Sequence, residues 1–456
     1  MPLSIVILAA GQGKRMQSTR AKVIHQVAGR PMLQHVVDTS KALDPDQIIV
    51  VVGHQSGQVR EAMKDQGLIF VEQAEQKGTG HAVQQCLAEL HEANDILVLY
   101  GDVPLISIAT INNLLEKAGG STINILSFLP DNAQGYGRIL RAPDGSVAAI
   151  VEEKDASSAE KKIQESNSGI LFIEGSQLTR LIGGIENNNV QAEYYLTDVV
   201  KLAVQEGLKV SATLCSDAAE LSGVNDQQQL AEAENKYRQI QASRLMMQGV
   251  KLYDPARIDI RGELQAGFDV EIDVNCVFEG RVTLGDRVRI GANCVIRDTT
   301  IDSDSVVLPM TSIDQAVIGR RVSIGPFARI RPGTECANDA KIGNFVEVKK
   351  ASIGAGSKVN HLSYIGDTQM GSEVNVGAGT ITCNYDGANK HQTIIENGVF
   401  IGSDTQLIAP VTIAEGSTLG AGSTITRDTP AHKLSLSRSK QVVIDTWQRP
   451  VKRTRD

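Results

Sequence analysis

The 456-residue sequence predicts two halves of different fold class: an α/β N-terminal half with a mostly parallel sheet, and an all-β C-terminal half that forms a parallel β-helix. Two observations predict this division. Short apolar runs alternate with helical segments up to about residue 227, as in an open parallel sheet. After residue 250 aliphatic residues recur at every sixth position, which is the hexapeptide period of a solenoid.

The apolar runs of the N-terminal half are expected to be strands of a Rossmann-like sheet. These runs are 4–10, 48–54, 68–73 and 95–102, with helices expected at 31–43, 79–91 and 107–117. Ligands of such sheets bind beyond the carboxyl ends of the strands. The residues that end the first and the last of these runs are therefore the first candidates for a site.

A helical connection is predicted between the two halves. Residues 226–248 contain neither Gly nor Pro, and their apolar residues approximate one helical stripe: Leu230, Ala233, Tyr237, Ile240 and Leu245. We therefore divide the chain into a domain at 1–227, a helical linker at 228–248 and a second domain at 249–456.

Two unbroken series define the solenoid. They are Ile318, Ile324, Ile330, Cys336, Ile342 and Val348, and then Ile401, Leu407, Ile413, Leu419 and Ile425. Three hexads should make one coil, with the aliphatic side chain pointing inward. Cys276 and Cys294 lie one coil apart and are expected to stack in one small inward slot. The period breaks near 297–317 and at 382–393, and inserted loops, which often carry function, are expected there.

Composition excludes several classes of protein. A net charge of -8 argues against a dedicated nucleic-acid binder. No apolar run approaches the ~20 residues of a membrane span, and no signal peptide is evident. The six cysteines are scattered without a C-x-x-C pair, which fits a protein of the reducing cytoplasm.

A glycine loop with two cations follows the first strand, at residues 9–15. Exposed backbone N–H groups in such a loop bind phosphate well, so a nucleotide is the first hypothesis. Two common glycine fingerprints are absent, because position 16 is Met and no G-K-[ST] follows. An ordinary strand-to-helix turn with solvated charges is the alternative at this point.

With both halves considered, the sequence resembles the bacterial bifunctional N-acetylglucosamine-1-phosphate uridyltransferases/glucosamine-1-phosphate acetyltransferases. The resemblance covers essentially the whole chain and rests on motifs in a fixed order: LAAGQGKRM, GTGHA, YGDVPL, GYGRI, VEEKDA and NNNVQAEYYLTD, then DPARIDIRG, GPFARIRPG, GNFVEVKK, GAGTITCNYDGANK and IGSDTQLIAPV. It implies a nucleotidyltransferase domain, a left-handed β-helix and a cytoplasmic homotrimer assembled through that helix. Lys14, Ala21 and Ala192 depart from the family pattern.

The resemblance implies that the first domain transfers UMP from UTP to N-acetylglucosamine 1-phosphate and releases pyrophosphate. Arg15 and Lys22 would neutralise the phosphates, and Asp102 and Asn225 would hold Mg²⁺. The nucleotide positions would be Leu8, Ala9, Ala10, Gly11, Lys22, Gln73, Gly78, Thr79, Tyr100, Gly101 and Asp102, and the sugar positions Gly137, Glu152 and Asn167. Without the resemblance, Asp102 could be only a turn former, Asn225 a helix cap and Lys22 a solvated lysine. If Glu152 and Glu153 lie in a strand, at most one of them faces the pocket.

The resemblance also implies that the second domain acetylates glucosamine 1-phosphate with acetyl-CoA. His361 would be the general base, Arg331 and Lys349 would hold the sugar phosphate, and Tyr364 and Asn375 would contact the sugar. The acetyl-CoA positions would be Ala378, Asn384, Tyr385, Ser403, Ala421 and Arg438. Independently of the resemblance, Arg331 and Lys349 lie one coil apart, and two stacked cations favour an anion between them. His391 and His432 are expected to be exposed.

Three alternatives remain open from the residues alone. The solenoid could serve only assembly or regulation, so that His361, Arg331 and Lys349 have no catalytic role. It could be a zinc enzyme of the β-helical carbonic anhydrase type, which needs three converging histidines. The whole chain could be a trimeric scaffold without activity, although that leaves the cationic glycine loop unexplained.

Overall fold

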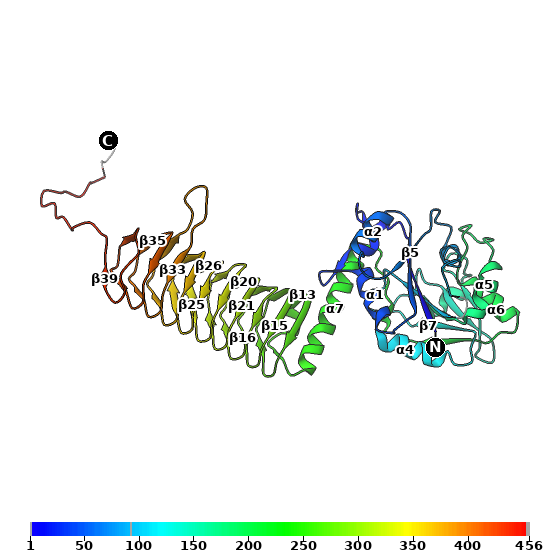
Figure 1. The fold of residues 1–456 in the computed structure, drawn as a ribbon. Coiled ribbons are helices and arrows are strands. Elements are labelled where there is room, and N and C mark those ends of the chain that lie inside the picture. Colours follow the sequence, from blue (N-terminus) through cyan, green and yellow to red (C-terminus); the bar gives the residue numbers. More distant parts are fainter. Residues whose placement is uncertain (1, 92–93, 453–456) are drawn as a thin grey trace. The chain divides into compact units, whose positions relative to one another are not determined.

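The computed structural model describes residues 2–91 and 94–452. Its contacts divide the chain into two compact units, Met1–Ile240 and Gln241–Asp456. Figure 1 shows an α/β sheet in the first unit and a solenoid in the second. The α/β and parallel β-helix fold classes are thus confirmed.

The first unit contains a nine-stranded sheet whose main path runs β11-β7-β10-β6-β1-β4-β5. Its strands are β1 (Leu3–Ala9), β4 (Gln47–Val52), β5 (Ile69–Glu72), β6 (Asp95–Tyr100), β7 (Ile123–Phe128), β8 (Arg138–Arg141), β9 (Val147–Val151), β10 (Ser166–Ile173) and β11 (Val210–Leu214); β2 (Gln26–Val27) and β3 (Arg30–Pro31) pair separately. The strand β1 pairs in parallel with β4 and β6, whereas β10 runs antiparallel to β6 and β7. The central strands therefore end together at one edge.

Helices cover both faces of this sheet. They are α1 (Met32–Lys41), α2 (Ser56–Ala62), α3 (Thr79–Gln84), α4 (Ile108–Lys117), α5 (Gly175–Gly183) and α6 (Asp198–Gln205), with short helices η1 (Lys14–Met16), η2 (Lys22–Ile24), η3 (Glu160–Lys162) and η4 (Ala218–Leu221). Alternate residues of β1 enter different cores. Ile5 and Ile7 belong to a core that includes residues of α1, α2 and α4, and Val6 and Leu8 to one that includes residues of α3, α5 and α6.

The helices predicted from the sequence agree with those of the structure to different degrees. The predictions at 31–43 and 107–117 correspond to α1 and α4, and the Ser107 hydroxyl caps α4 by accepting from the Thr110 N–H. The prediction at 79–91 is wrong in length, because α3 ends at Gln84 and turns follow. The C-terminal part of that segment supplies buried apolar side chains such as Cys86 without regular helix.

The predicted connecting helix is α7, Gln227–Met247. Ala233 belongs to a core of the first unit and Leu245 to the core of the second, so the division at Ile240 falls inside the helix. Ile240 is 43% exposed, and the expected single apolar stripe is wrong at that position. The N-terminal part of α7 thus packs in the first unit and its C-terminal part in the second.

The second unit is a parallel solenoid with two long sheets. One has the strands β12 (Lys251–Leu252), β14 (Glu271–Ile272), β16 (Arg289–Ile290), β19 (Val306–Val307), β22 (Ser323–Ile324), β25 (Lys341–Asn344), β28 (Lys358–His361), β31 (Asn375–Val376), β34 (Phe400–Ile401), β37 (Thr418–Leu419) and β39 (Leu434–Ser435). The other comprises β13 (Ile258–Ala266), β15 (Cys276–Leu284), β17 (Val295–Arg297), β18 (Thr300–Ile301), β20 (Ser312–Asp314), β21 (Ala316–Ile318), β23 (Arg329–Ile330), β24 (Thr334–Cys336), β26 (Glu347–Lys349), β27 (Ser352–Ile353), β29 (Tyr364–Gly366), β30 (Thr368–Met370), β32 (Ile381–Cys383), β33 (Thr393–Ile395), β35 (Gln406–Ile408), β36 (Val411–Ile413) and β38 (Thr424–Ile425). The short helix η5 (Pro255–Arg257) precedes β13.

Both predicted aliphatic series are buried along their whole length. Cys276 and Cys294 are buried in successive coils, each as a free thiol, as the stacking prediction requires.

The two breaks of the period have different origins. The expected inserted loop at 297–317 is wrong: Leu284 pairs with Ile301 and Ile301 with Ile318, so the coils are one residue short and no loop protrudes. The break at 382–393 is a true insertion, because Met370 pairs with Ile395. This insertion leaves the solenoid between β32 and β33.

Candidate active sites

A cavity of about 260 Å³ lies at the carboxyl ends of β1 and β6. It is lined by Leu8, Ala9, Ala10, Gly11, Lys22, Val23, Gln73, Gln76, Gly78, Thr79, Ala82, Tyr100, Asp102 and Glu193. Most of the residues expected to bind the nucleotide thus line this one cavity. Gly101 follows the lining residue Tyr100, and a Cβ there would be in tight contact with Leu33 Cδ1, at 3.2 Å.

The glycine loop folds back on a lysine. Gly13 has a φ of +60°, and a Cβ at this position would lie 2.8 Å from the Cβ of Lys22. The loop continues into η1, where Lys14 and Arg15 are exposed, so Arg15 is free to meet a ligand from outside the cavity. The expected strand-loop geometry is present, but a 3₁₀ turn follows it where an α-helix would be usual.

Lys22, Asp102 and Asn225 form one cluster. The Lys22 ammonium is paired with Asp102 Oδ2 and donates to Asn225 Oδ1 at 3.1 Å. A hydrogen bond of 2.9 Å from the Val224 N–H to the Asp102 carbonyl brings the two segments together. The alternatives of a solvated lysine, a turn former and a simple cap are therefore insufficient, because all three side chains meet in a partly buried site.

The donor set of this cluster fits a hard cation. Carboxylate and amide oxygens are ligands that Mg²⁺ accepts, and Mg²⁺ usually keeps water and phosphate as its other ligands. Among the residues that the structure describes, no group of three or more His, Cys, Asp or Glu side chains could hold a metal ion alone. A two-ligand site completed by phosphate oxygens is consistent with both facts.

Gln73 is held rigidly at the other end of the cavity. Its buried side-chain Nε2 donates to the Gly78 carbonyl at 3.0 Å and lies 3.0 Å from His81 Nδ1. Burial and the charge of Lys77 lower the pKa of His81, which favours the neutral ring that can accept this bond. His81 was not predicted from the sequence; its place in GTGHA, two residues after Thr79, was the available signal.

The three expected sugar positions lie together beside Tyr100. The Asn167 N–H donates to the Gly137 carbonyl at 2.8 Å, and a Cβ on Gly137 would lie 3.3 Å from Glu152 Oε2. Gly169 packs against the Tyr100 ring so closely that a Cβ would lie 2.6 Å away. Burial raises the pKa of the Tyr100 hydroxyl, which therefore stays neutral and can donate or accept hydrogen bonds.

Glu152 and Glu153 do have different partners, although not for the expected reason. Strand β9 ends at Val151, so neither residue lies in a strand. Glu152 Oε1 accepts from the Thr197 hydroxyl at 2.9 Å, whereas Glu153 pairs with the buried Arg138 guanidinium at 2.8 Å. Burial is the main cause that raises the pKa of Glu152.

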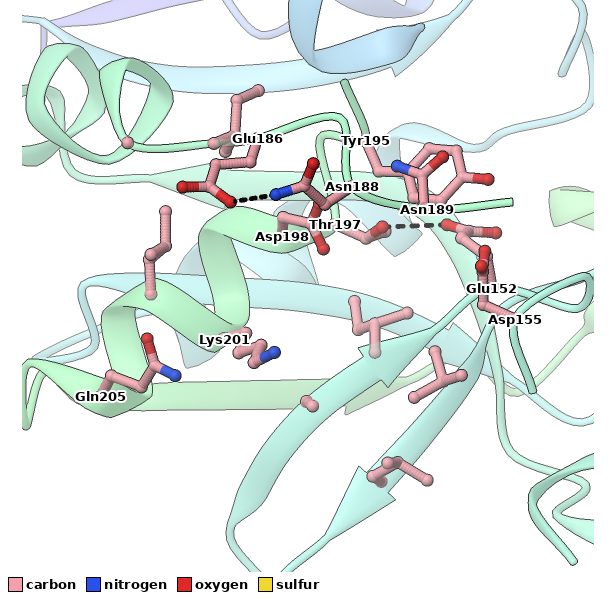
Figure 2. A pocket seen from close by; sticks show the side chains of 17 residues that line it. Glu152, Asp155, Glu186, Asn188, Asn189, Tyr195, Thr197, Asp198, Lys201 and Gln205 are labelled. Atoms are coloured by element: carbon pink, nitrogen blue, oxygen red, sulfur yellow. Dashed lines mark hydrogen bonds between the residues drawn. The ribbon is translucent and has the colours of Figure 1, made fainter. Parts of the chain in front are cut away.

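A second cavity, of about 640 Å³, opens on Glu152 (Figure 2). It lies between the β8–β9 hairpin, residues 184–189 and α6. Asp155 and Asp198 line it with Glu152, and Lys201 is the single lysine of its wall. Of these residues, only Glu152 was predicted from the sequence.

In the solenoid, a ladder of charges leads to Arg331 and Lys349. The strand register places Arg261, Glu279, Arg297 and Asp314 at equivalent positions of successive coils, and their charges alternate in sign. The pairs Arg261–Glu279 and Arg297–Glu279 are salt bridges. Ile330 pairs with Val348, so Arg331 and Lys349 lie at equivalent positions of neighbouring coils, as predicted. Here two cations follow one another.

Lys390, from the inserted loop, joins these cations. Contact with Lys390 is the largest cause that lowers the pKa of Lys349, and the charges of Lys390 and Arg331 lower it further. Glu347 accepts from Arg331 Nη1 at 2.8 Å. An anion would relieve the repulsion of Lys349 and Lys390. Lys390 was not predicted from the sequence, although it lies in the same GAGTITCNYDGANK motif as Asn384 and Tyr385.

His361 lies at the end of β28 and is exposed. Its Nδ1 is 2.9 Å from Asn344 Oδ1, on the neighbouring coil. An amide oxygen only accepts hydrogen bonds, so in the neutral ring Nδ1 carries the proton and Nε2 the lone pair. Asn344 was also missed, although it is the second residue of the quoted GNFVEVKK motif.

The remaining acetyltransferase positions follow His361 towards the C-terminus. The Ser403 carbonyl accepts from Gly422 and the Ala378 carbonyl from Asp404, so these turns stack. Arg438 Nη1 donates to the Ala421 carbonyl at 3.0 Å. Tyr364 pairs in register with Glu347, and Asn375 with Lys358 in the other sheet.

The inserted loop is a short hairpin. Tyr385 bridges to Lys390, and Asn384 Nδ2 donates to the Asp367 carboxylate. His391 Nε2 lies 2.7 Å from Asp386 Oδ2, and the residue is only partly exposed, so it is less exposed than expected. His432 is exposed as expected.

Fold and sites together define a two-site transferase, with a nucleotidyltransferase sheet and a hexapeptide-repeat solenoid. Three family models match parts of the chain: a MobA-like NTP transferase domain over residues 5–166, a GMPPB C-terminal domain over 260–353, and the bacterial transferase hexapeptide (six repeats) over 392–427. No helix among residues 2–91 and 94–452 has the length and apolar character needed to cross a membrane.

Full-length relatives identify the family. The bifunctional protein GlmU of Cupriavidus pinatubonensis is 54% identical over 99% of this chain and 100% of its own. Those of Nitrosospira multiformis and Ralstonia nicotianae are 55% and 51% identical over 98% and 100% of their own lengths. The chain belongs to the GlmU family, and it is a bifunctional uridylyltransferase and acetyltransferase of UDP-N-acetylglucosamine synthesis.

Proposed function

We propose that the two activities are divided between the two halves, with uridylyl transfer in residues 1–227, acetyl transfer in 249–456 and residues 228–248 as the link. The cavity beyond β1 and β6 supports the first assignment, since Lys22, Asp102 and Asn225 converge there. The cluster of Arg331, Lys349 and Lys390 supports the second.

In the first site, phosphate attacks phosphate, so catalysis is chiefly positioning and charge neutralisation. Residues 8–11 hold the nucleotide through backbone groups, Lys22 meets the reacting phosphates and Arg15 the departing pyrophosphate. Asp102 and Asn225 would hold Mg²⁺, which would neutralise negative charge on the phosphates.

The substrates are held at the two ends of that cavity. Gln73, Gly78 and Thr79 contact the uracil of UTP, and Gln73 offers its side-chain oxygen, because its Nε2 is already engaged. Tyr100 and Gly101 line the middle. Gly137, Glu152 and Asn167 bind N-acetylglucosamine 1-phosphate.

In the second site, Nε2 of His361 takes a proton from the amine of glucosamine 1-phosphate as that amine attacks the acetyl thioester carbon. The C–S bond then breaks, and the imidazolium returns the proton to the leaving sulfur, so amide and free CoA result. Arg331, Lys349 and Lys390 hold the phosphate, while Tyr364 and Asn375 contact the sugar. Acetyl-CoA lies along Ala378, Asn384, Tyr385, Ser403, Ala421 and Arg438.

The solenoid assembles as a homotrimer with this site at its surface. Met310, Phe327, Phe345 and Leu362 form an exposed apolar ladder at successive turns, and Leu362 follows His361 directly. All four have a positive φ, and Phe327 stacks on Phe345 with ring centroids 5.2 Å apart. Large side chains in this conformation carry a cost that a second copy covering them would offset.

We place the enzyme in the cytoplasm, where its six free thiols are stable.

Two variants test the division of labour in the full chain. Asp102→Ala should abolish pyrophosphate release from UTP and leave thiol release from acetyl-CoA near wild type. His361→Ala should do the reverse, with acetyl transfer reduced roughly 10²–10⁴-fold, the usual contribution of a positioned base. Loss of both activities in either folded variant would contradict two independent sites.

A further inference from the structure

Thr197 occupies a position where a helix cap is expected but does not act as one. It immediately precedes α6, and threonine before a helix usually accepts a hydrogen bond from an N–H of the first turn. Its side chain makes no such bond. The hydroxyl instead donates to Glu152 Oε1 at 2.9 Å, across 45 residues of sequence, as the dashed line of Figure 2 shows.

This bond sets how the Glu152 carboxylate lies. Oε1 is held by Thr197, and Oε2 lies on the side of Gly137, where a Cβ would come within 3.3 Å of it. Glu153, the next residue, is anchored by the buried Arg138 on the strand that follows Gly137. Oε1 is therefore engaged by Thr197 and the neighbouring residue is anchored, which leaves Oε2 as the oxygen that can meet a ligand.

We propose that Thr197 is a positioning residue for sugar recognition, which orients Glu152 so that its carboxylate accepts hydrogen bonds from hydroxyl groups of the sugar phosphate. This inference rests on the proposed contact of Glu152 with the sugar. Thr197 itself lines the cavity of Figure 2 beside Glu152 and has its hydroxyl committed to the carboxylate.

The surroundings of Glu152 make this hydrogen bond important. Burial raises the pKa of Glu152, and Asp198, Asp155 and Glu193 raise it further, whereas the Thr197 hydroxyl lowers it. Tyr100 and Tyr195 also face the carboxylate and are neutral at ordinary pH. Among these groups, Thr197 is the neighbour that favours the ionised form. Its removal should both loosen the carboxylate and let it protonate at higher pH.

Thr197→Val tests the proposal in the full chain, because it removes the hydroxyl and keeps the shape. The KM for N-acetylglucosamine 1-phosphate should rise about 10-fold, in line with a lost hydrogen bond to a charged group, and the KM for UTP should stay within twofold. The acid limb of kcat/KM for the sugar phosphate should move to higher pH. Thr197→Ser, which keeps the hydroxyl, should retain wild-type values.

Three results would overturn the proposal. The first is an unchanged KM for the sugar phosphate and an unchanged acid limb of kcat/KM in Thr197→Val. The second is an equal rise of that KM in the valine and serine variants. The third is an equal rise of the KM for UTP and for the sugar phosphate in Thr197→Val. Thr197→Ala, which only shortens the side chain, replaces the valine variant if that variant does not fold. Glu152→Ala separates the two levels of inference: an unchanged sugar KM there refutes the proposed role of Glu152 itself, whereas a raised KM with a normal Thr197→Val refutes only the role of Thr197.

Discussion

His361 and Asn344 lie on neighbouring coils of the solenoid, with 2.9 Å between Nδ1 of the histidine and Oδ1 of the amide. This pairing decides which ring nitrogen is available. The proton is held on Nδ1, so Nε2 can act as the proposed base without first changing tautomer.

Asn344→Leu should therefore lower kcat for acetyl transfer by about 10-fold to 100-fold, the range expected when a reacting group is misplaced. The KM for glucosamine 1-phosphate should change little, because the cations that hold the phosphate remain. Thiol release from acetyl-CoA measures the effect. Asn344→Asp is the matched control: it keeps an acceptor at the same place and should retain more activity than the leucine variant. Equal activity of wild type and Asn344→Leu would show that the tautomer is set by another group.

The buried ion pair of Arg138 and Glu153 leads to a prediction about stability. The Arg138 guanidinium also donates to the Tyr136 carbonyl, and the Arg138 side chain is 3% exposed. Arg138→Met should destabilise the protein by about 3–5 kcal/mol, since it leaves Glu153 partly buried without its partner. The double variant Arg138→Met with Glu153→Met should recover much of that loss. Thermal unfolding checks both, and a double variant no more stable than Arg138→Met would show that the arginine acts through its backbone contacts alone.

The fold was predictable from the sequence because each half follows one strong period. The strand β1 and the two aliphatic series satisfy the periods of a buried strand and a hexad, and every predicted inward residue of the two series is buried. The shorter coils around Ile301 were misread as a loop, because a missing residue and an inserted segment interrupt a period in the same way. Only pairing between coils distinguishes the two.

The sites were predictable to a lesser degree. Local motifs and the family resemblance pointed to Lys22, Asp102 and His361, which carry charge or chemistry of their own. Asn344, Thr197 and Lys390 contact His361, Glu152 and Lys349 across coils or loops that are distant in sequence, and no local pattern reports such pairings. Thr197 even has a plausible local role as a cap, which the structure shows it does not perform.

The contacts of α7 predict that the first half needs part of the connecting helix. The Ala28 N–H donates to Glu234 at 2.7 Å, the Tyr237 ring lies 4.8 Å from His35, and Ala233 is buried against Val27. A fragment of residues 1–227 should thus be about 2–4 kcal/mol less stable than one of residues 1–248, since it uncovers this apolar surface. Denaturant unfolding of both fragments measures the difference. Equal stability would mean that α7 contributes nothing to the first core.

The cations of the second site make a prediction about pH. Lys349 has a lowered pKa, chiefly through Lys390, so it loses its proton at a lower pH than an ordinary lysine. Because the charged form binds phosphate, the KM for glucosamine 1-phosphate should rise as pH rises through that pKa. Lys390→Met removes the main cause of the shift. This variant should raise the KM near neutral pH, since one cation is lost. It should also move the alkaline rise of the KM to higher pH, since Lys349 then keeps its proton to a higher pH.

Comparison with wild type at each pH cancels the titration of the substrate amine, which all variants share. Lys350→Met is the matched control, because Lys350 is exposed beside Lys349 and takes no part in the cluster, so it should leave both the KM and its pH dependence unchanged. Arg331 stays in the cluster and should hold the residual phosphate binding at high pH. If Lys390→Met raises the KM without moving the alkaline rise, Lys390 contacts the phosphate but does not set the charge of Lys349. If neither quantity changes, the anion does not lie among these three cations.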